Sequence, residues 1–466
     1  MIGRSALYRT IWRWHFYAGL FVVPMVLVLA LTGATYLFKP QVDRWEERHF
    51  RALPAAGAVS PDDQVKAALA AFPGARLQSY RLPEADGDAA LVHVALPGKG
   101  GAMRDVFASP QGQVVGALDP AWRIMQIAHD IHGQLLLGPR GSWLVELAAS
   151  WAIVMLISGL YLWWPAGRGL AGVVWPRLTA GSRLFWRDLH AVTGFWVAGL
   201  ALVLLLTGLP WADVWGSAFK AVRIEMGWVR GVQDWTVGGR PAGSGEHAEH
   251  NHAAMIAGTR AMPAKAHVMP DGTVMTAAMT PVSLGRIVAE ARSEHLPFPV
   301  IVTPPGAAQA PWSVRSDTQN RPLRVTLTYD AMTGKRLSRE AFADKHPIDR
   351  VIGYGVAWHE GQLLGPINQL IGVATALMLV TLAVSGFVLW RRRAPPGRLG
   401  APPAPATPAK LRGVAVVVIA LAAFLPLLAA SLIVMVLLER LVLTRIPGLA
   451  RWLGIDRPEV SRTDPA

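Results

Sequence analysis

The chain of 466 residues contains no cysteine. This excludes disulfides, iron–sulfur clusters and thiol chemistry carried by the chain itself, so a redox role would need a bound cofactor. Charged residues are also scarce, at 16% against roughly 25% in soluble domains. Hydrophobic residues make up 52%, and the 19 tryptophans are of a type that gathers at membrane interfaces. This composition indicates an integral membrane protein.

Negative charge is under-represented: 31 aspartates and glutamates stand against 45 lysines and arginines, a formal net charge of +14. Such a balance is compatible with binding to nucleic acid or to an acidic surface. Most of the clustered arginines, however, flank apolar segments, where they act as topology signals. We therefore expect no nucleic-acid partner, and we expect membrane lipid to surround the apolar segments.

Long apolar runs dominate the sequence. A helix needs about 20 consecutive apolar residues to cross a bilayer. Five stretches have this length: 14–38, 143–164, 186–215, 367–390 and 414–438. The first follows Arg4, Arg9 and Arg13, as in a signal peptide. Its apolar run is too long for a signal sequence, so we expect it to remain as an anchor.

The arginine clusters predict the orientation. They lie before the first span, between the second and third, and between the fourth and fifth. Because positive loops stay on the cytoplasmic side, all three clusters agree on one topology. We expect a bacterial inner (cytoplasmic) membrane protein with a cytoplasmic N-terminus and with segments 39–142 and 216–366 in the periplasm.

Two halves of the chain repeat one another. His190 follows His15 by 175 positions, and His359 follows His132 by 227 positions. The first offset also relates Gly19 to Gly194 and Leu31-Thr32-Gly33 to Leu206-Thr207-Gly208. The second also relates Gly138-Pro139 to Gly365-Pro366, Ser158-Gly159 to Ser385-Gly386, and Leu162-Trp163 to Leu389-Trp390. The external segments correspond more loosely, each with a helix (62–72 and 284–295) followed by alternating strands and a turn.

We therefore predict a mainly α-helical integral membrane protein with about five transmembrane helices. They form a duplicated two-helix arrangement, with two small α+β periplasmic lobes and a fifth span outside the repeat. The expected segments are helix 1 (1–38), lobe 1 (39–125), a short helix with helix 2 (126–164), a cytoplasmic loop (165–185), helix 3 (186–215), lobe 2 with a His/Met-rich loop (216–350), a short helix with helix 4 (351–393), a Pro/Ala cytoplasmic linker (394–413), helix 5 (414–440) and a C-terminal tail (441–466).

The matched histidines are the candidate functional residues. An ionisable side chain within a membrane span is costly and usually functional. Gly19 and Gly194 lie one turn beyond His15 and His190 on the same helical face, where the missing side chain leaves room for a flat macrocycle. The glycines of the Leu-Thr-Gly triplets return to that face 18 residues beyond the histidines, a rise of about 27 Å at 1.5 Å per residue.

These positions predict two symmetric pairs: His15 with His190 inside, and His132 with His359 outside. Bis-histidine ligation of two b-type haems is a natural use of such pairs, with the four histidines as iron ligands. Arg13 and Arg187 are candidates to hold haem propionates. The alternatives are interfacial or packing histidines and a metal-ion site, although carboxylates are sparse in the spans.

His129 stands one turn before His132, and Val356 occupies the matching position in the second half. We expect His129 to be a neighbour of His132 or an alternative ligand. A second tract, His247, His250 and His252 followed by several methionines, has ligand types that suit copper, nickel, zinc or iron. The alternative for this tract is a solvated loop of low complexity.

The histidine signatures resemble the PepSY-associated transmembrane-helix family, and the external segments resemble PepSY domains. The resemblance covers roughly residues 8–393. Its motifs are Trp14-His15-x3-Gly19, Asp130-Ile131-His132 through Gly138-Pro139, Leu189-His190-x3-Gly194, and Trp358-His359-Glu360-Gly361 through Gly365. Members include iron-regulated inner-membrane proteins and haem-containing reductases of ferric siderophores, some of them fused to flavin and nicotinamide-binding domains.

The resemblance implies an enzyme, a ferric-siderophore (ferric-chelate) reductase that passes electrons across the membrane to a siderophore or another periplasmic iron or metal complex. This sequence departs from the fused members because no Gly-x-Gly-x-x-Gly follows a strand, so we expect a separate cytoplasmic or quinol electron donor. Trp312, Arg315, Arg321 and Arg324 are candidates for an exposed face that receives the acceptor, or else ordinary strand-surface residues. The competing functions are a non-enzymatic regulatory or peptide-binding membrane protein and a metal transporter.

Overall fold

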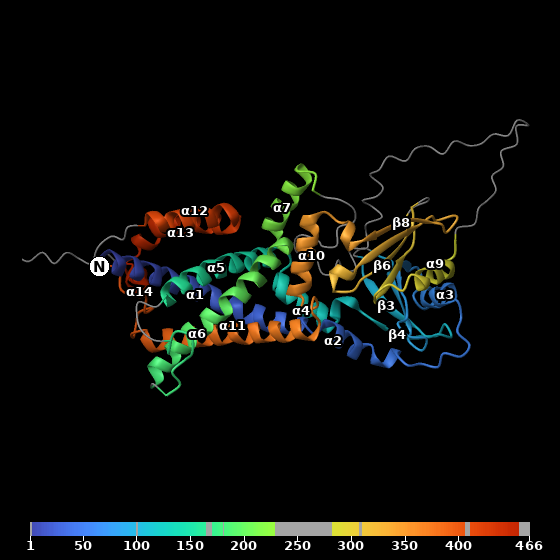
Figure 1. Ribbon diagram of the computed structural model, residues 1–466, viewed down its shortest axis with the longest axis horizontal. Coiled ribbons are helices and arrows are strands. Elements are labelled where there is room, and N and C mark those ends of the chain that lie inside the picture. The colour runs from blue at the N-terminus through green and yellow to red at the C-terminus, as the bar shows by residue number, and fades with distance from the viewer. Residues whose placement is uncertain are drawn as a thin grey trace, which may run out of the picture.

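A computed structural model describes residues 2–98, 101–164, 170–179, 181–228, 282–306, 310–405 and 411–455. The long apolar runs form a bundle of helices, and a β-sheet with its own helices lies beyond one end of this bundle (Figure 1). We call that end the lobe end. The opposite end carries Arg13, Arg187 and Arg392, and we call it the basic end.

Five helices of the described chain are long and apolar enough to cross a membrane. Four of them pack around one another: α1 (Ile2–Tyr36), α5 (Pro139–Trp163), α6 (Ser182–Gly208) and α11 (Pro366–Arg393). Helices of this length satisfy their backbone hydrogen bonds internally, as the bilayer requires. The prediction of a mainly helical integral membrane protein is confirmed.

Each half of the repeat supplies the same set of helices to the bundle. In the first half, α1 packs against α5 and against the short α4 (Ile124–Gln134). In the second half, α6 packs against α11 and against the short α10 (Pro347–His359). The halves meet where α1 contacts α11 and where α5 contacts α6. The sequence duplication is therefore a structural duplication around a shared centre.

The two external lobes join into a single antiparallel sheet. The first half supplies β1 (Arg76–Arg81), β2 (Ala90–Ala95), β3 (Met103–Ala108) and β4 (Val114–Leu118). The second half supplies β5 (Val300–Thr303), β6 (Trp312–Ser316), β7 (Val325–Tyr329) and β8 (Arg336–Ala341). The strand order is β4-β3-β2-β1-β5-β6-β7-β8, so β1 and β5 pair at the centre.

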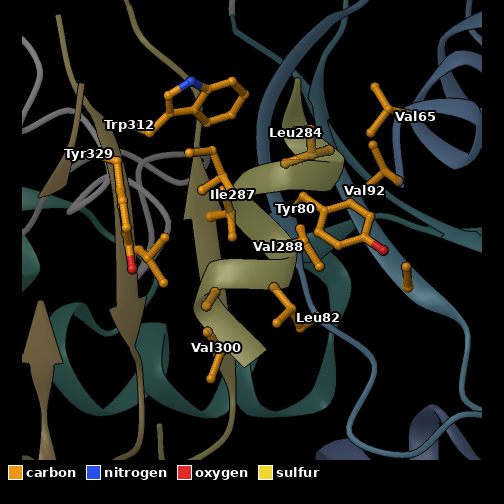
Figure 2. Packing of buried hydrophobic residues seen from close by; sticks show 14 of the residues in the cluster. Val65, Tyr80, Leu82, Val92, Leu284, Ile287, Val288, Val300, Trp312 and Tyr329 are labelled. Carbon is orange, nitrogen blue, oxygen red and sulfur yellow. The ribbon is translucent and has the colours of Figure 1, made fainter. Parts of the chain in front are cut away.

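One hydrophobic core covers both halves of this sheet. The helix α3 (Pro61–Ala71) and its counterpart α9 (Leu284–Ser293) pack on the same face. Ile287 on α9 is fully buried among side chains of both halves, including Tyr80 and Trp312 (Figure 2). The carboxylate of Asp62, on α3, accepts hydrogen bonds from the backbone N–H groups of Leu284 and Gly285. A negative charge at a helix N-terminus is favourable, so Asp62 ties the halves together.

The fifth apolar stretch is not one helix, as the sequence predicted over 414–440, but two. The helix α12 (Arg412–Phe424) ends at an extended Leu425, and α13 begins with Pro426 and ends at Leu441. Proline has no N–H and clashes with the preceding turn, which breaks the helix there. Arg13 hydrogen-bonds both Pro402 O, before α12, and Gly454 O, after α13. The pair is therefore a hairpin that starts and finishes at the basic end.

Candidate functional site

A large cavity runs through the bundle between its two ends. Its volume is about 2040 Å³, and its walls come from all four packed helices of the repeat. Single ligand pockets commonly measure roughly 300–1,000 Å³, so this space accommodates more than one ligand. Four of its lining residues are the histidines that the repeat singles out: His15, His132, His190 and His359. The structure thus brings all four to one space.

The basic end of the cavity holds His15 on α1 and His190 on α6. The Nδ1 of His15 lies 2.8 Å from the hydroxyl of Ser158 on α5. The Nδ1 of His190 lies 3.1 Å from the hydroxyl of Ser385 on α11, and also 3.1 Å from the carbonyl oxygen of Leu382. Each imidazole is therefore held by the other spanning helix of its own half.

The lobe end of the cavity holds His132 on α4 and His359 on α10. Their Nδ1 atoms lie 3.1 Å from the hydroxyl of Thr32 and 3.2 Å from that of Thr207. The Nδ1 of His359 also lies 3.0 Å from the carbonyl oxygen of Leu204. After each short helix, a glycine with positive φ precedes a proline that begins the next spanning helix. Proline is favoured at the first position of a helix, so these Gly-Pro pairs set where α5 and α11 start.

A glycine faces each imidazole from the helix that supplies the hydroxyl. A Cβ on Gly33 would lie 3.0 Å from the Cε1 atom of His132, and one on Gly208 would lie 3.2 Å from that of His359. At the basic end, a Cβ on Gly159 would lie 3.3 Å from the Cε1 atom of His15, and one on Gly386 would lie 3.3 Å from that of His190. Each histidine thus sits on a dipeptide of one hydroxyl residue and one glycine, which we call its seat. The four seats are Thr32-Gly33, Ser158-Gly159, Thr207-Gly208 and Ser385-Gly386.

The glycines that contact the imidazoles are not Gly19 and Gly194, which the sequence predicts to leave room for a macrocycle. Both line the cavity, but a Cβ on Gly19 would meet Met155 at 3.4 Å, and one on Gly194 would meet Leu382 at 3.5 Å. Positions four residues apart on a helix project side by side rather than toward each other. The space directly against each imidazole therefore comes from the facing helix. Gly19 and Gly194 leave space on the cavity wall one turn away, and their role beside a macrocycle stays a prediction.

Each level of the cavity combines one histidine from each half. The ring centroids of His132 and His359 lie 6.2 Å apart, with 76° between the ring planes. Two imidazole nitrogens that share a metal at about 2.0–2.1 Å each lie about 4 Å apart, which places the ring centroids roughly 6 Å apart. The centroid distance of the lobe-end pair matches that of two imidazoles on one metal atom.

The two levels are separated by about five helical turns. Gly33, which faces His132, lies on the same helix as His15 and 18 residues beyond it. At 1.5 Å per residue this is about 27 Å, close to the thickness of the hydrocarbon core. The same spacing separates His190 from Gly208 on α6. The cavity can thus hold one ligand near each membrane surface.

Arginines line the basic end of the cavity. They include Arg187, one of the two expected residues, but not Arg13. Arg13 is absent from the cavity wall, because its guanidinium bonds Tyr17 and the carbonyl oxygens of Pro402 and Gly454. Arg187 does line the cavity, 2.7 Å from the carboxylate of Asp188. Further arginines on the wall, which the sequence analysis did not select, are Arg177, Arg183, Arg392 and Arg393. This end of the cavity favours an anionic group.

His129 lies at the wall near the lobe end and is 44% exposed. Its Nδ1 is 3.3 Å from the carboxylate of Asp130, and its ring contacts that of Tyr36 at 5.7 Å between centroids. Because His132 rather than His129 faces His359, the structure places His129 as a neighbour of the pair.

The proposed receiving face on the sheet is wrong. Trp312, Arg315, Arg321 and Arg324 are all buried, with exposed fractions of 4–6%. Arg315 and Arg324 pair with Asp317, and Arg321 pairs with Glu360 beside His359. These ion pairs, within the sheet domain and against the bundle, bury arginine side chains that strand periodicity alone predicts to lie on the surface. The tract of His247, His250 and His252 lies outside the described residues.

The seat hydroxyls of Thr32, Ser158, Thr207 and Ser385 are the functional candidates that the sequence analysis missed. All four belong to the duplicated motifs, and that duplication was the available signal. A hydroxyl within an apolar helix commonly bonds its own backbone, which gave no reason to pair it with a particular histidine.

Five apolar helices, a duplicated set of histidine seats and a shared internal cavity define an integral membrane protein with two levels of paired histidines. A family model described as the PepSY-associated TM region matches residues 12–393, and the chain belongs to this family. No curated protein matches the chain.

Proposed function

We propose that this protein binds two b-type haems, one at each level of the cavity, and passes electrons through them from one side of the membrane to the other. The observation that carries this proposal is the placement of two cross-half histidine pairs in one continuous cavity. A bound haem supplies reversible one-electron chemistry, and its potential depends on axial ligands and surroundings. His15 and His190 hold the haem at the basic end, and His132 and His359 hold the haem at the lobe end.

The donor set favours haem over a bare metal ion. Among the described residues there is no group of three or more His, Cys, Asp or Glu side chains that could hold a metal ion. Two imidazoles alone leave most coordination positions of a metal unfilled. A haem would bring its own ring nitrogens, and each histidine pair would supply the two protein ligands that it still needs. The size of the cavity supports the same choice.

The remaining wall residues orient the cofactors and exclude water. Arg183, Arg187, Arg392 and Arg393 line the basic end of the cavity, where they would hold the propionates of a haem by charge-assisted hydrogen bonds. Arg393 also stacks over Trp12 and Phe16, at 5.1 and 5.0 Å from the ring centroids. Apolar side chains from α1, α5, α6 and α11 line the middle of the cavity, which keeps the dielectric low there.

Electrons enter at the basic end and leave at the lobe end in this proposal. By the positive-inside rule, the arginine clusters support a cytoplasmic basic end. In this proposal the chain lies in a bacterial inner membrane with its sheet domain in the periplasm. The donor is a separate cytoplasmic protein or quinol. The exit lies near His129, whose partly exposed ring stands one turn from His132.

The acceptor that we propose is ferric iron in a siderophore, which would make the protein a ferric-chelate reductase for iron uptake. The support is the family resemblance of the histidine signatures, together with a cavity whose lobe-end wall includes Arg321 of the sheet domain. The experiment for this step is a reduction assay of the purified protein against several ferric siderophores and simple ferric chelates. We expect His132→Ala and His359→Ala to lose reduction of the ferric chelates. A variant with a substitution on the exposed surface of the sheet should retain it.

An absorption spectrum tests the cofactor. We expect a Soret band, α and β bands that sharpen with dithionite, and two haems per chain. His15→Ala and His190→Ala should each remove the basic-end haem and leave the other, and His132→Ala and His359→Ala should do the reverse. His129→Ala is the matched control and should retain both haems.

A colourless protein from haem-replete cells would overturn the proposal. The regulatory and transport functions would then be the ones to test, by peptide binding and by metal uptake into vesicles.

A further inference from the structure

The four seat hydroxyls each donate their one hydrogen to their own helix. Thr32 bonds the carbonyl oxygen of Val28 at 2.8 Å, and Ser158 bonds that of Val154 at 2.7 Å. In the second half, Thr207 bonds Val203 O at 2.8 Å and Ser385 bonds Thr381 O at 2.6 Å. Bonds of this kind are common for hydroxyl residues in membrane helices. Each seat oxygen is therefore left with acceptor capacity only.

This leaves one assignment for the imidazole hydrogen. A hydroxyl oxygen whose hydrogen is already donated can only accept, so the nitrogen facing it must be Nδ1–H. Backbone carbonyls lead independently to the same result. The Nδ1 of His190 faces Leu382 O and that of His359 faces Leu204 O, and a carbonyl can only accept.

The opposite tautomer conflicts with these contacts. With the hydrogen on Nε2, the Nδ1 lone pair of His359 would face a carbonyl oxygen at 3.0 Å, and that of His190 would face one at 3.1 Å. Thr207 and Ser385 would have to give up their bonds to their own helices to compensate. Buried polar atoms without a hydrogen bond are unfavourable, so the Nε2–H tautomer is disfavoured.

We propose that Thr32, Ser158, Thr207 and Ser385 are positioning residues that hold each histidine as the Nδ1–H tautomer and present the Nε2 lone pair to a metal. The proposal rests on the proposed function, since the metal is the haem iron. A neutral imidazole has a single N–H, so hydrogen on Nδ1 leaves Nε2 free to coordinate. The glycine of the same seat lets the ring approach closely enough for the bond, as the 3.0–3.3 Å contacts show.

The four seats differ in one respect that makes the proposal testable. Among the hydrogen bonds of the described chain, the Nδ1 of His15 has the hydroxyl of Ser158 as its acceptor and no backbone carbonyl. The Nδ1 of His190, its partner at the basic end, has both Ser385 and Leu382. Removing the hydroxyl should therefore release His15 but leave His190 held by a carbonyl.

The experiment begins with haem-free protein labelled with ¹⁵N-histidine and measured by solid-state NMR. The four histidines are assigned by the signals that vanish in their alanine variants. All four should show the Nδ1–H tautomer in the wild-type chain. Ser158→Ala should convert His15 to a mixture of tautomers, whereas Ser385→Ala should leave His190 as Nδ1–H. An Nε2–H signal for these histidines in the wild-type chain would overturn the proposal.

The second arm measures haem retention and midpoint potential. Partners that orient a ligand histidine typically contribute about 10–100-fold to metal affinity, so Ser158→Ala should weaken retention of the basic-end haem by about that factor and shift its potential. Ser158→Thr should restore both. Ser150→Ala is the matched control, because Ser150 lies on the same helix and bonds Glu146 O in the same way.

Equal behaviour of Ser158→Ala and Ser150→Ala in both arms would overturn the assignment. A protein that takes up no haem yet shows the Nδ1–H tautomer would overturn the proposed function while supporting the positioning of the imidazoles.

Discussion

At the scale of single residues, the site depends on small side chains as much as on the histidines. Each imidazole contacts a glycine at a distance where an added methyl group would crowd it. Packed interiors respond to a single added carbon, because neighbouring atoms have little room to move. The seats therefore restrict both the direction of each ring and its depth in the cavity.

Gly208→Ala should displace His359 and lower the content of lobe-end haem. The new Cβ would lie 3.2 Å from the Cε1 atom of His359, so the ring must shift away from residue 208 and out of its present position opposite His132. Haem retention at that level should fall by about tenfold, as for other changes that misorient a ligand. Gly199→Ala is the control on the same helix, because its Cβ meets no atom within 4 Å. Pyridine haemochrome analysis measures both variants, and equal haem content would contradict the prediction.

Glu47 predicts how stability depends on pH in the region that joins the sheet to the bundle. Burial alone raises the pKa of this carboxyl, but the guanidinium groups of Arg81 and Arg123, at 2.5 and 2.9 Å, lower the pKa below its ordinary value. A depressed folded-state pKa adds stability above the unfolded-state pKa, and this stability is lost as the pH falls through the folded value. The protein should therefore lose stability on acidification from about pH 4.5 downward.

Glu47→Gln tests this reading. The variant should be less stable at neutral pH by about 3 kcal/mol, because breaking a buried ion pair leaves charge uncompensated. It should also lose less stability than the wild-type chain on acidification. Denaturant unfolding of the detergent-solubilised chain at neutral pH and at about pH 3 gives both quantities. Parallel losses in the two proteins would show that Glu47 does not titrate in this window.

At the scale of elements, the last apolar stretch shows how one residue changes topology. Its composition suits a single crossing, and the sequence predicts one. Pro426 divides it into α12 and α13, and the hydrogen bonds of Arg13 bring both ends of the pair to the basic end. The hairpin packs on the bundle through Leu425 and Leu428, which are buried beside Ile153 of α5.

Single-cysteine labelling checks this topology, since the chain has no cysteine of its own. Arg451→Cys, in α14 (Pro447–Leu453), should react with an impermeant maleimide from the same side as Leu178→Cys. Ala55→Cys, before the sheet, should react from the opposite side. All three positions are exposed. Labelling of Arg451→Cys together with Ala55→Cys would mean that the last apolar stretch crosses the membrane once.

At the scale of the whole molecule, both functional parts are shared between the repeats. The histidine pairs take one ring from each half, and the sheet is continuous through β1 and β5. Neither half alone contains a complete pair or a complete sheet core. A fold of this kind makes the two halves cooperative, because each buries its apolar surface against the other.

Ile287→Ala should weaken the sheet in both halves. The side chain is fully buried in the common core, and its truncation costs about 2–5 kcal/mol. Hydrogen exchange should speed up in β2 as well as in β6, although only β6 belongs to the same half as Ile287. Leu428→Ala, equally buried but in α13, should leave exchange in the sheet unchanged. Faster exchange confined to the second half would show that the lobes unfold separately.

Much of the architecture follows from local patterns. Apolar length predicted the four packed spanning helices, and the external helices expected over 62–72 and 284–295 match α3 and α9 within a residue or two. The duplicated offsets selected the four histidines that the cavity brings together. The same patterns misplaced Arg13, which the C-terminal segment engages, and exposed Trp312 and its neighbouring arginines, which the fold buries.

The sequence by itself determined the membrane class, the duplication and the identity of the histidines. Apolar length and the offsets of a repeat can both be read from the order of residues alone, without knowledge of tertiary contacts. Only the tertiary structure decided which glycine faces which imidazole, that the two lobes share a sheet, and that α12 and α13 turn back. Those outcomes depend on how helices rotate and pack against segments a hundred or more residues away. Local sequence patterns do not predict such long-range packing.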